Sequence, residues 1–219
     1  KIASFELVDI PLLRYVASKG KPMIMSTGMA TQEEIKEALQ AAYLEHNDGV
    51  ILLKCSSAYP AIPDDMHLRT IEDMKQRFNV PVGLSDHSLG ALSATTAIAL
   101  GASVIEKHFC LSREIDNPDA SFSMTPEEFS AMVVDIRKVE KALGRVTYGP
   151  SDQELGSLKF RKSIFVVEEI GEGESFTEKN TRVIRPGYGL KPKYYQDILG
   201  KSAARPMKRG TPLQWEDIG

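Results

Sequence analysis

The sequence contains little cysteine, no long apolar run and no excess of positive charge. Its two cysteines, Cys55 and Cys110, are too few among 219 residues for a disulfide framework, which favours a reducing cytoplasm. No uninterrupted apolar segment approaches the roughly 20 residues that are needed to cross a bilayer. The formal net charge is −3, so neither nucleic acid nor an anionic membrane is expected as the main partner.

The first two thirds of the chain alternates short apolar segments with segments of helical periodicity. Strands are predicted at 22–27, 50–56, 80–87 and 103–109, and helices at 31–47, 66–78, 91–101 and 125–144. This alternation predicts βαβ units, and the apolar strands predict an α/β fold with a parallel sheet covered on both faces. The pattern alone leaves open whether the sheet closes into a barrel or stays open and doubly wound.

The character of the sequence changes after Gly144. Residues 147–160 are polar and rich in turn formers, which predicts a linker. From Arg161 to the last residue, short strands and frequent turns predict a small compact module. The chain is therefore divided into a large domain (1–146), a linker (147–160) and a small β-rich domain (161–219).

Two of the four histidines stand at the ends of predicted strands. Because side chains alternate along a strand, His108 shares a face with Glu106, and His87 on a neighbouring strand can converge with it. Two imidazoles with a carboxylate and water suit a divalent transition metal, although two hydrogen-bonded histidines at a sheet rim would give the same pattern. The other two, His46 and His67, are predicted to be solvated residues on helices.

Several polar side chains also follow predicted strands. A lysine and hydroxyl groups at a barrel mouth can hold a phosphate, but ordinary loop hydrogen bonding is the simpler explanation of their positions. These residues are Lys1, Ser4, Ser26 and Ser85. Taken singly, Tyr59 and Asp119 are compatible with turn chemistry, and Arg185 with a surface position.

Seven motifs together are more specific than any one residue. KIASFE, STGM, LLKCSSAYP, VGLSDH, IEKHF, NPDASFSM and IRPGYG occur in this order along the chain. With them, essentially the whole chain resembles the sialic acid synthase family. It is most similar to the pseudaminic acid and spore-coat polysaccharide synthases through ASFELVDIPLL, EKALG and RPGYGLKPKYY. The module from 161 resembles the antifreeze-like, or SAF, domain of that family.

The resemblance implies a transferase built on a (β/α)8, or TIM, barrel that condenses phosphoenolpyruvate with an N-acyl amino sugar and releases phosphate. It implies Mn²⁺ or Mg²⁺ held by His87 and His108, with phosphoenolpyruvate held by Lys1, Ser4, Ser26 and Ser85. The sugar would contact Glu6, Tyr59 and Asp119, and Arg185 from a second subunit would cap it in a domain-swapped homodimer.

Three departures from the family pattern qualify this expectation. Ser57 stands where sialic acid synthases usually have asparagine, which disfavours N-acetylmannosamine, and Asn117 replaces a usual glycine with no consequence that the sequence reveals. Only five barrel strands are counted, the first of them beginning at Ile2, so the first three βα units are expected to be missing. Five strands cannot close an eight-stranded barrel, and the exposed edge of the sheet would need to be covered by another segment or by a partner.

Three other functions remain open at this point. One is an N-acetylneuraminate synthase that uses N-acetylmannosamine. Another is a different phosphoenolpyruvate aldolase, such as an octulosonate phosphate synthase, which the downstream IRPGYG module disfavours. The last is an inactive barrel fragment that serves as a binding or interaction protein.

Overall fold

The computed structural model describes residues 1–114 and 117–219 and consists of two compact units, unit 1 (Lys1–Arg145) and unit 2 (Val146–Gly219). No helix in the described part of the chain is both long and apolar enough to span a membrane.

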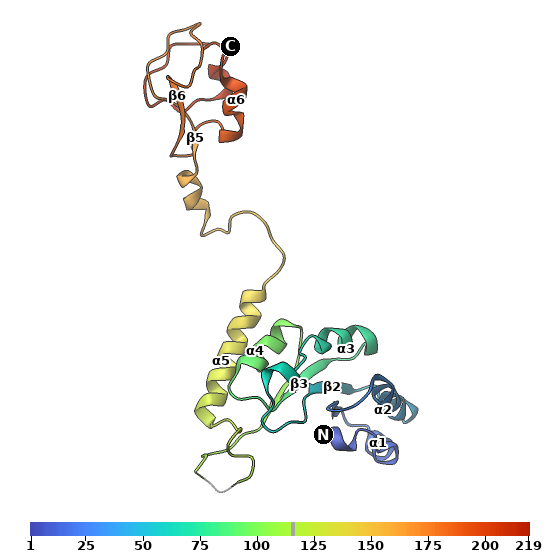
Figure 1. Ribbon diagram of the computed structural model, residues 1–219. Helices are drawn as coiled ribbons and strands as arrows, with labels where there is room; N and C mark the ends of the chain where they lie inside the picture. The colour runs from blue at the N-terminus through green and yellow to red at the C-terminus, as the bar shows by residue number, and fades with distance from the viewer. Residues whose placement is uncertain (115–116) are drawn as a thin grey trace. The chain divides into compact units, whose positions relative to one another are not determined.

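Unit 1 is built on a parallel sheet with strand order β1-β2-β3-β4 (Figure 1). The strands are β1 (Met23–Ser26), β2 (Val50–Cys55), β3 (Val82–Asp86) and β4 (Ile105–Lys107). Ile2 adds an isolated parallel bridge to Met25 at the β1 edge. The predicted α/β fold with a parallel sheet is confirmed, and the sheet curls into a half-barrel.

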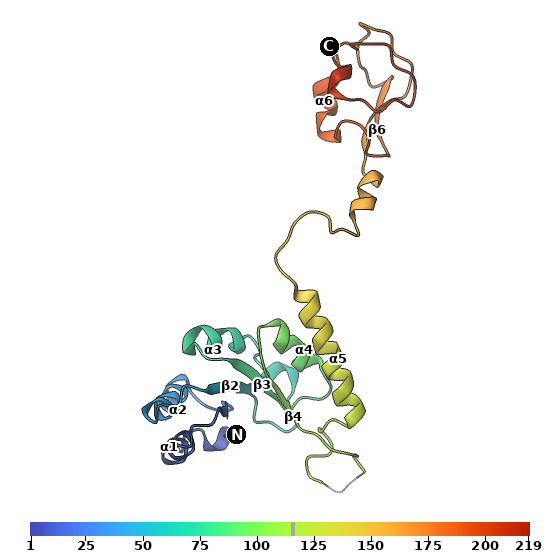
Figure 2. The same ribbon diagram turned by 180° about the vertical axis from the view of Figure 1, so that it is seen from behind.

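The described residues of unit 1 form five α-helices. They are α1 (Ile10–Ala17), α2 (Gln32–Leu44), α3 (Thr70–Phe78), α4 (Leu92–Ala99) and α5 (Pro126–Leu143). Thr31 and Thr125 cap the starts of α2 and α5, each with a glutamate three residues later that completes a capping box. Figure 2 shows α4 and α5 side by side, in agreement with their contacts.

Two helical predictions need correction. Helix α1 was not predicted at all, although Asp9 caps it and Pro11 occupies its first turn. The predicted helix at 66–78 begins only at Thr70, because His67 has a left-handed φ of 42° that an α-helix cannot contain. His46 likewise has a positive φ and follows the end of α2. Both histidines are exposed, as predicted, but neither lies within a helix.

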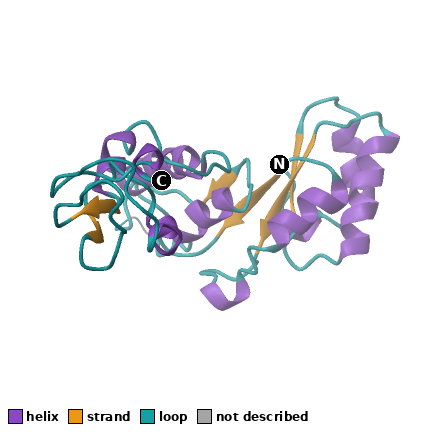
Figure 3. Cartoon of the chain, turned by 90° about the horizontal axis from the view of Figure 1, so that it is seen from above, coloured by secondary structure: helices purple, strands orange, loops and turns teal. Residues whose placement is uncertain are grey.

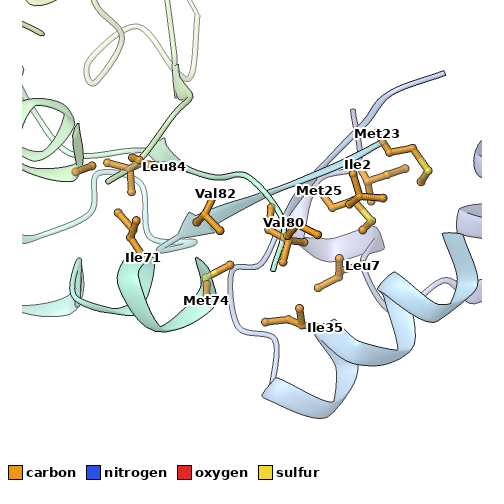
Figure 4. Close-up of a cluster of buried hydrophobic side chains, with 14 of the residues drawn as sticks. Ile2, Leu7, Met23, Met25, Ile35, Ile71, Met74, Val80, Val82 and Leu84 are labelled. Atoms are coloured by element: carbon orange, nitrogen blue, oxygen red, sulfur yellow. The ribbon is translucent and has the colours of Figure 1, made fainter. Parts of the chain in front are cut away.

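The hydrophobic core of unit 1 lies between the helices and one face of the sheet. Met23 and Met25 of β1 and Val82 and Leu84 of β3 point into this core, which Ile71 and Met74 complete from α3 (Figure 4). Because side chains alternate, the other face of the sheet, here called the inner face, carries the remaining strand residues. At the carboxyl ends of the four strands these are Ser26, Cys55, Ser85 and Glu106.

Unit 2 has its own small core around Phe176, Ile164 and Leu213. Strand β5 (Ser163–Val166) pairs antiparallel with β6 (Thr181–Ile184), and α6 (Tyr195–Ile198) is a single helical turn. The other strands predicted here are reduced to isolated bridges, such as Ile170 to Met207, and much of the unit is loop (Figure 3). Within the predicted linker, residues Leu155–Phe160 form a 3₁₀ helix.

Candidate active site

His87 and His108 lie next to each other just beyond the ends of β3 and β4. Their ring centroids are 5.2 Å apart and the rings are nearly perpendicular. The side chains of Ser85, His87, Glu106 and His108, with Lys107, line a cavity of about 200 Å³. The convergence that alternation predicted is therefore present in the structure.

The hydrogen bonds of both imidazoles leave one ring nitrogen available. His87 Nδ1 lies 2.8 Å from the carbonyl oxygen of Ser56, and because a carbonyl can only accept, Nδ1 carries the proton. His108 Nδ1 faces Asp119 Oδ2 at 3.4 Å. In the neutral form of both rings Nε2 then presents a lone pair, which is the arrangement of metal-ligating histidines whose second nitrogen is held by a carbonyl or carboxylate.

These two side chains do not complete a metal site alone. In residues 1–114 and 117–219, no group of three or more His, Cys, Asp or Glu side chains has the geometry to hold an ion. The two imidazoles fit a divalent ion whose remaining ligands are oxygen atoms of water or substrate, the open coordination of a catalytic site.

The surroundings of the two histidines shift their pKa values in opposite directions. Burial lowers the pKa of His108, and the neighbouring His87 lowers it further, so His108 is neutral at physiological pH. Burial also lowers the pKa of His87, but the hydrogen bonds of His87 with Cys55 and with the Ser56 carbonyl outweigh this effect, so the pKa of His87 is raised. Conversely, burial raises the pKa of Cys55, but His87, Ser4 and Ser57 bring it down to about 7.

Lys1 and Ser85 converge on Glu106 beside the histidines. Lys1 Nζ donates to Glu106 Oε1 at 2.8 Å, and Ser85 Oγ donates to the same oxygen at 2.7 Å. Burial raises the pKa of Glu106, yet these two donors lower it more, so the carboxylate is ionised. A cation, a hydroxyl and an anion thus share the inner face with the imidazoles.

The predicted serines Ser4 and Ser26 lie near the start of the chain and at the end of β1. Ser4 Oγ accepts the backbone N–H of Gly28 at 3.0 Å. A Cβ atom added at Gly28 would lie only 2.1 Å from Ser57 Oγ and 2.7 Å from Ser4 Oγ, so this glycine lets the two hydroxyls approach. Ser26 is buried, and its Oγ has no hydrogen-bond partner among the described residues.

Aromatic side chains enclose the histidines on one side. The Tyr59 ring centroid lies 4.2 Å from that of His87 and 5.9 Å from that of His108. Phe122, which the sequence did not single out, stacks 5.0 Å from His108. Tyr59 remains half exposed, so its ring can meet both the histidines and a ligand in the opening.

Two further predicted site residues are exposed. Glu6 is exposed at the end of the 3₁₀ helix Ser4–Glu6. Arg185 is an exposed residue of unit 2, immediately after β6, where Arg185–Pro186 is a cis peptide bond.

Three residues of the site were not among the predicted site residues. Glu106 could have been chosen, because alternation places it on the face of His108. Cys55 could also have been found, since it ends β2 at the same edge of the sheet as Ser85 on β3. No pattern in the sequence marks Phe122, because it lies outside the predicted strands and helices. Its position in the structure is close to the isolated bridge between Phe109 and Met124.

Comparisons with known proteins support the motif-based resemblance. A model of the NeuB family matches residues 1–148, and a model of the SAF domain matches residues 161–219. Pseudaminic acid synthase of Campylobacter jejuni is 44% identical over 218 residues, which cover 100% of this chain and 64% of that protein. The pseudaminic acid synthase of Helicobacter pylori is 41% identical over 219 residues, with the same coverage.

A solved structure shows the same architecture. Spore coat polysaccharide biosynthesis protein SpsE of Bacillus subtilis matches with a TM-score of 0.62 and 32% identity, over 100% of this chain and 66% of SpsE. The chain spans 64% of the length of the two pseudaminic acid synthases.

Proposed function

Because the chain belongs to the NeuB family, we propose that it is the part of a nonulosonic acid synthase, of the pseudaminic acid type, that carries the metal-binding histidines. The half-barrel of unit 1 belongs, in this proposal, to a (β/α)8 barrel. The observation that carries the proposal is the pair of imidazoles with free Nε2 atoms beside Lys1 and Ser85 on one sheet edge.

The reaction joins phosphoenolpyruvate to the open-chain form of an N-acyl amino sugar. C3 of phosphoenolpyruvate forms a bond to the aldehyde carbon, whose oxygen takes a proton. Water adds to C2, and the C–O bond to the phosphate breaks to release inorganic phosphate. A divalent ion, Mn²⁺ or Mg²⁺, held by His87 and His108 would supply Lewis-acid polarisation of the aldehyde oxygen.

The remaining side chains bind and orient the substrates in this proposal. Lys1 supplies the positive charge for the phosphate of phosphoenolpyruvate, with Ser4, Ser26 and Ser85 as hydrogen-bond partners. The unpartnered Ser26 Oγ supports this role, because a buried hydroxyl without a partner is unfavourable until a ligand oxygen meets it. For the sugar we propose contacts with Glu6, Ser57, Tyr59 and Asp119.

The test is a phosphate-release assay with phosphoenolpyruvate, Mn²⁺ and a panel of N-acyl amino sugars that includes N-acetylmannosamine. Release with an amino sugar other than N-acetylmannosamine is expected. Preference for N-acetylmannosamine would instead favour an N-acetylneuraminate synthase. No release with any sugar at saturating phosphoenolpyruvate and metal would contradict the proposal and favour a binding protein.

Replacing Arg185 with alanine is expected to impair use of the sugar selectively. We propose that Arg185 of a second subunit, in a domain-swapped homodimer, caps the sugar. Hydrogen bonds to charged groups contribute about 1.5–3 kcal/mol, so kcat/KM for the sugar should fall roughly 10- to 100-fold while KM for phosphoenolpyruvate is unchanged. Arg182→Ala, an exposed arginine on β6 of the same unit, is the control and should change neither constant. Equal kinetics for both variants would contradict the role of Arg185.

A further inference from the structure

A buried ion pair joins β3 and β4 directly behind the two histidines. Lys107 Nζ donates to Asp86 Oδ2 at 2.8 Å, and the two side chains are 1% and 0% exposed. Asp86 and Lys107 are register partners at the last pair of residues that the two strands share. Because side chains alternate along a strand, both side chains point away from the face that carries His87 and His108, and both are shielded from solvent.

The ion pair also binds Ser88, the residue that follows His87. Asp86 Oδ1 accepts the backbone N–H of Ser88 at 2.9 Å and the Ser88 hydroxyl at 2.7 Å. Lys107 Nζ also donates to the Ser88 carbonyl at 2.6 Å. Ser88 Oγ is in turn hydrogen-bonded to Ser93 Oγ of α4 at 2.9 Å. Asp86 and Ser88 flank His87, and Lys107 immediately precedes His108.

Stability alone does not explain this network. Removing two charges from water costs several kcal/mol for each ion, and apolar residues of similar volume often replace a buried ion pair without loss. What apolar residues cannot supply are directed bonds to the N–H, the carbonyl and the hydroxyl of Ser88. Those bonds fix the backbone on which both imidazoles are mounted.

We propose that the Asp86–Lys107 pair, with Ser88, is a positioning device that holds His87 and His108 at the separation needed to bind one divalent ion. This inference rests on the proposed function, because it takes the two imidazoles as metal ligands. Asp86 and Lys107 are positioning residues: they act through the backbone of Ser88 and of the two histidines.

The experiment compares the apolar double variant Asp86→Leu/Lys107→Met with the unmodified protein. Mn²⁺ alone is the probe, and its binding is followed by loss of the electron paramagnetic resonance signal of the free ion. The expected result is an unchanged urea midpoint with Mn²⁺ affinity weakened roughly 10- to 100-fold, as for other groups that orient metal ligands. In the synthase assay kcat should fall while KM for phosphoenolpyruvate stays the same.

Two further variants keep the test decisive. Arg14→Met/Glu45→Leu removes an ion pair between α1 and the end of α2, away from the site, and should leave Mn²⁺ affinity unchanged. Ser88→Ala keeps both buried charges and removes one hydroxyl. If the apolar double variant does not fold, Ser88→Ala tests the positioning role instead. This variant is expected to bind Mn²⁺ several-fold more weakly than the unmodified protein.

The outcomes separate this inference from the proposed function. Wild-type Mn²⁺ affinity in the folded double variant, or in Ser88→Ala where that variant decides, would overturn the positioning role and leave the proposed function intact. Failure of the unmodified protein to bind Mn²⁺ would overturn the proposed function and the inference together.

Discussion

Replacing His87 with alanine is expected to abolish Mn²⁺ binding and to lower kcat for phosphate release by roughly 10³-fold. The substitution removes one of the two imidazoles proposed as ligands, and no third His, Cys, Asp or Glu in the described residues completes a site with them. A metal ion contributes several kcal/mol to such a reaction, and about 1.4 kcal/mol is a factor of ten in rate. Phosphate release and Mn²⁺ titration measure the two effects separately.

The protein should still fold after this substitution. His87 makes a hydrogen bond to the Ser56 carbonyl and stacks on Tyr59, so its loss should cost only about 1–2 kcal/mol of unfolding free energy. His46→Ala, which changes an exposed histidine in the same unit, is the matched control and should keep full activity. Normal turnover by a purified His87→Ala protein would rule out the metal role.

Much of the candidate site followed from two simple properties of strands. Alternation placed Ser85 and His87 on one face, and parallel pairing brought their strand beside the one that carries His108. The structure confirms the parallel order and brings the two imidazoles 5.2 Å apart. Neither step required knowledge of the loops.

Other features depend on contacts that spacing does not reveal. Asp86 and Lys107 are charged residues at the ends of apolar strands, where a solvated rim is the simpler expectation. In the structure both are buried beside Ser88, whose hydroxyl is bonded to Ser93 of α4, and the position of α4 cannot be deduced from the spacing of residues. Helix α1 was missed for a similar reason, because its buried residues Leu13 and Ala17 are too few to give a clear periodicity.

Replacing Gly83 with alanine is expected to destabilise unit 1 strongly and to disturb the site together with the fold. Gly83 is the second residue of β3 and lies on the inner face, opposite Leu53 of β2. An added Cβ would lie 2.3 Å from the Val104 carbonyl oxygen and 2.7 Å from Leu53 Cδ2. Both distances are shorter than any van der Waals contact, and the first involves backbone that cannot rotate away.

The strands must therefore move apart to admit the methyl group. Leu84 N–H bonds to the Val104 carbonyl at 2.9 Å, so that movement weakens the pairing of β3 with β4 just before the two histidines. Overpacking of this kind costs about 1–3 kcal/mol, with lost ladder hydrogen bonds in addition. Urea unfolding should show a lower midpoint for Gly83→Ala, and Mn²⁺ affinity should fall even where the protein is folded.

Gly49→Ala provides the matched control for this change, because it makes the same substitution next to β2 in the same unit. There the added Cβ would meet only Asn47 Oδ1 at 3.4 Å and Pro22 Cα at 3.6 Å. Its urea midpoint should stay within experimental error of the unmodified protein. An equal midpoint for Gly83→Ala would mean that β3 and β4 are not packed as closely as the structure shows. The 5.2 Å separation of the imidazoles would then lose its structural basis, since β3 and β4 lead directly into His87 and His108.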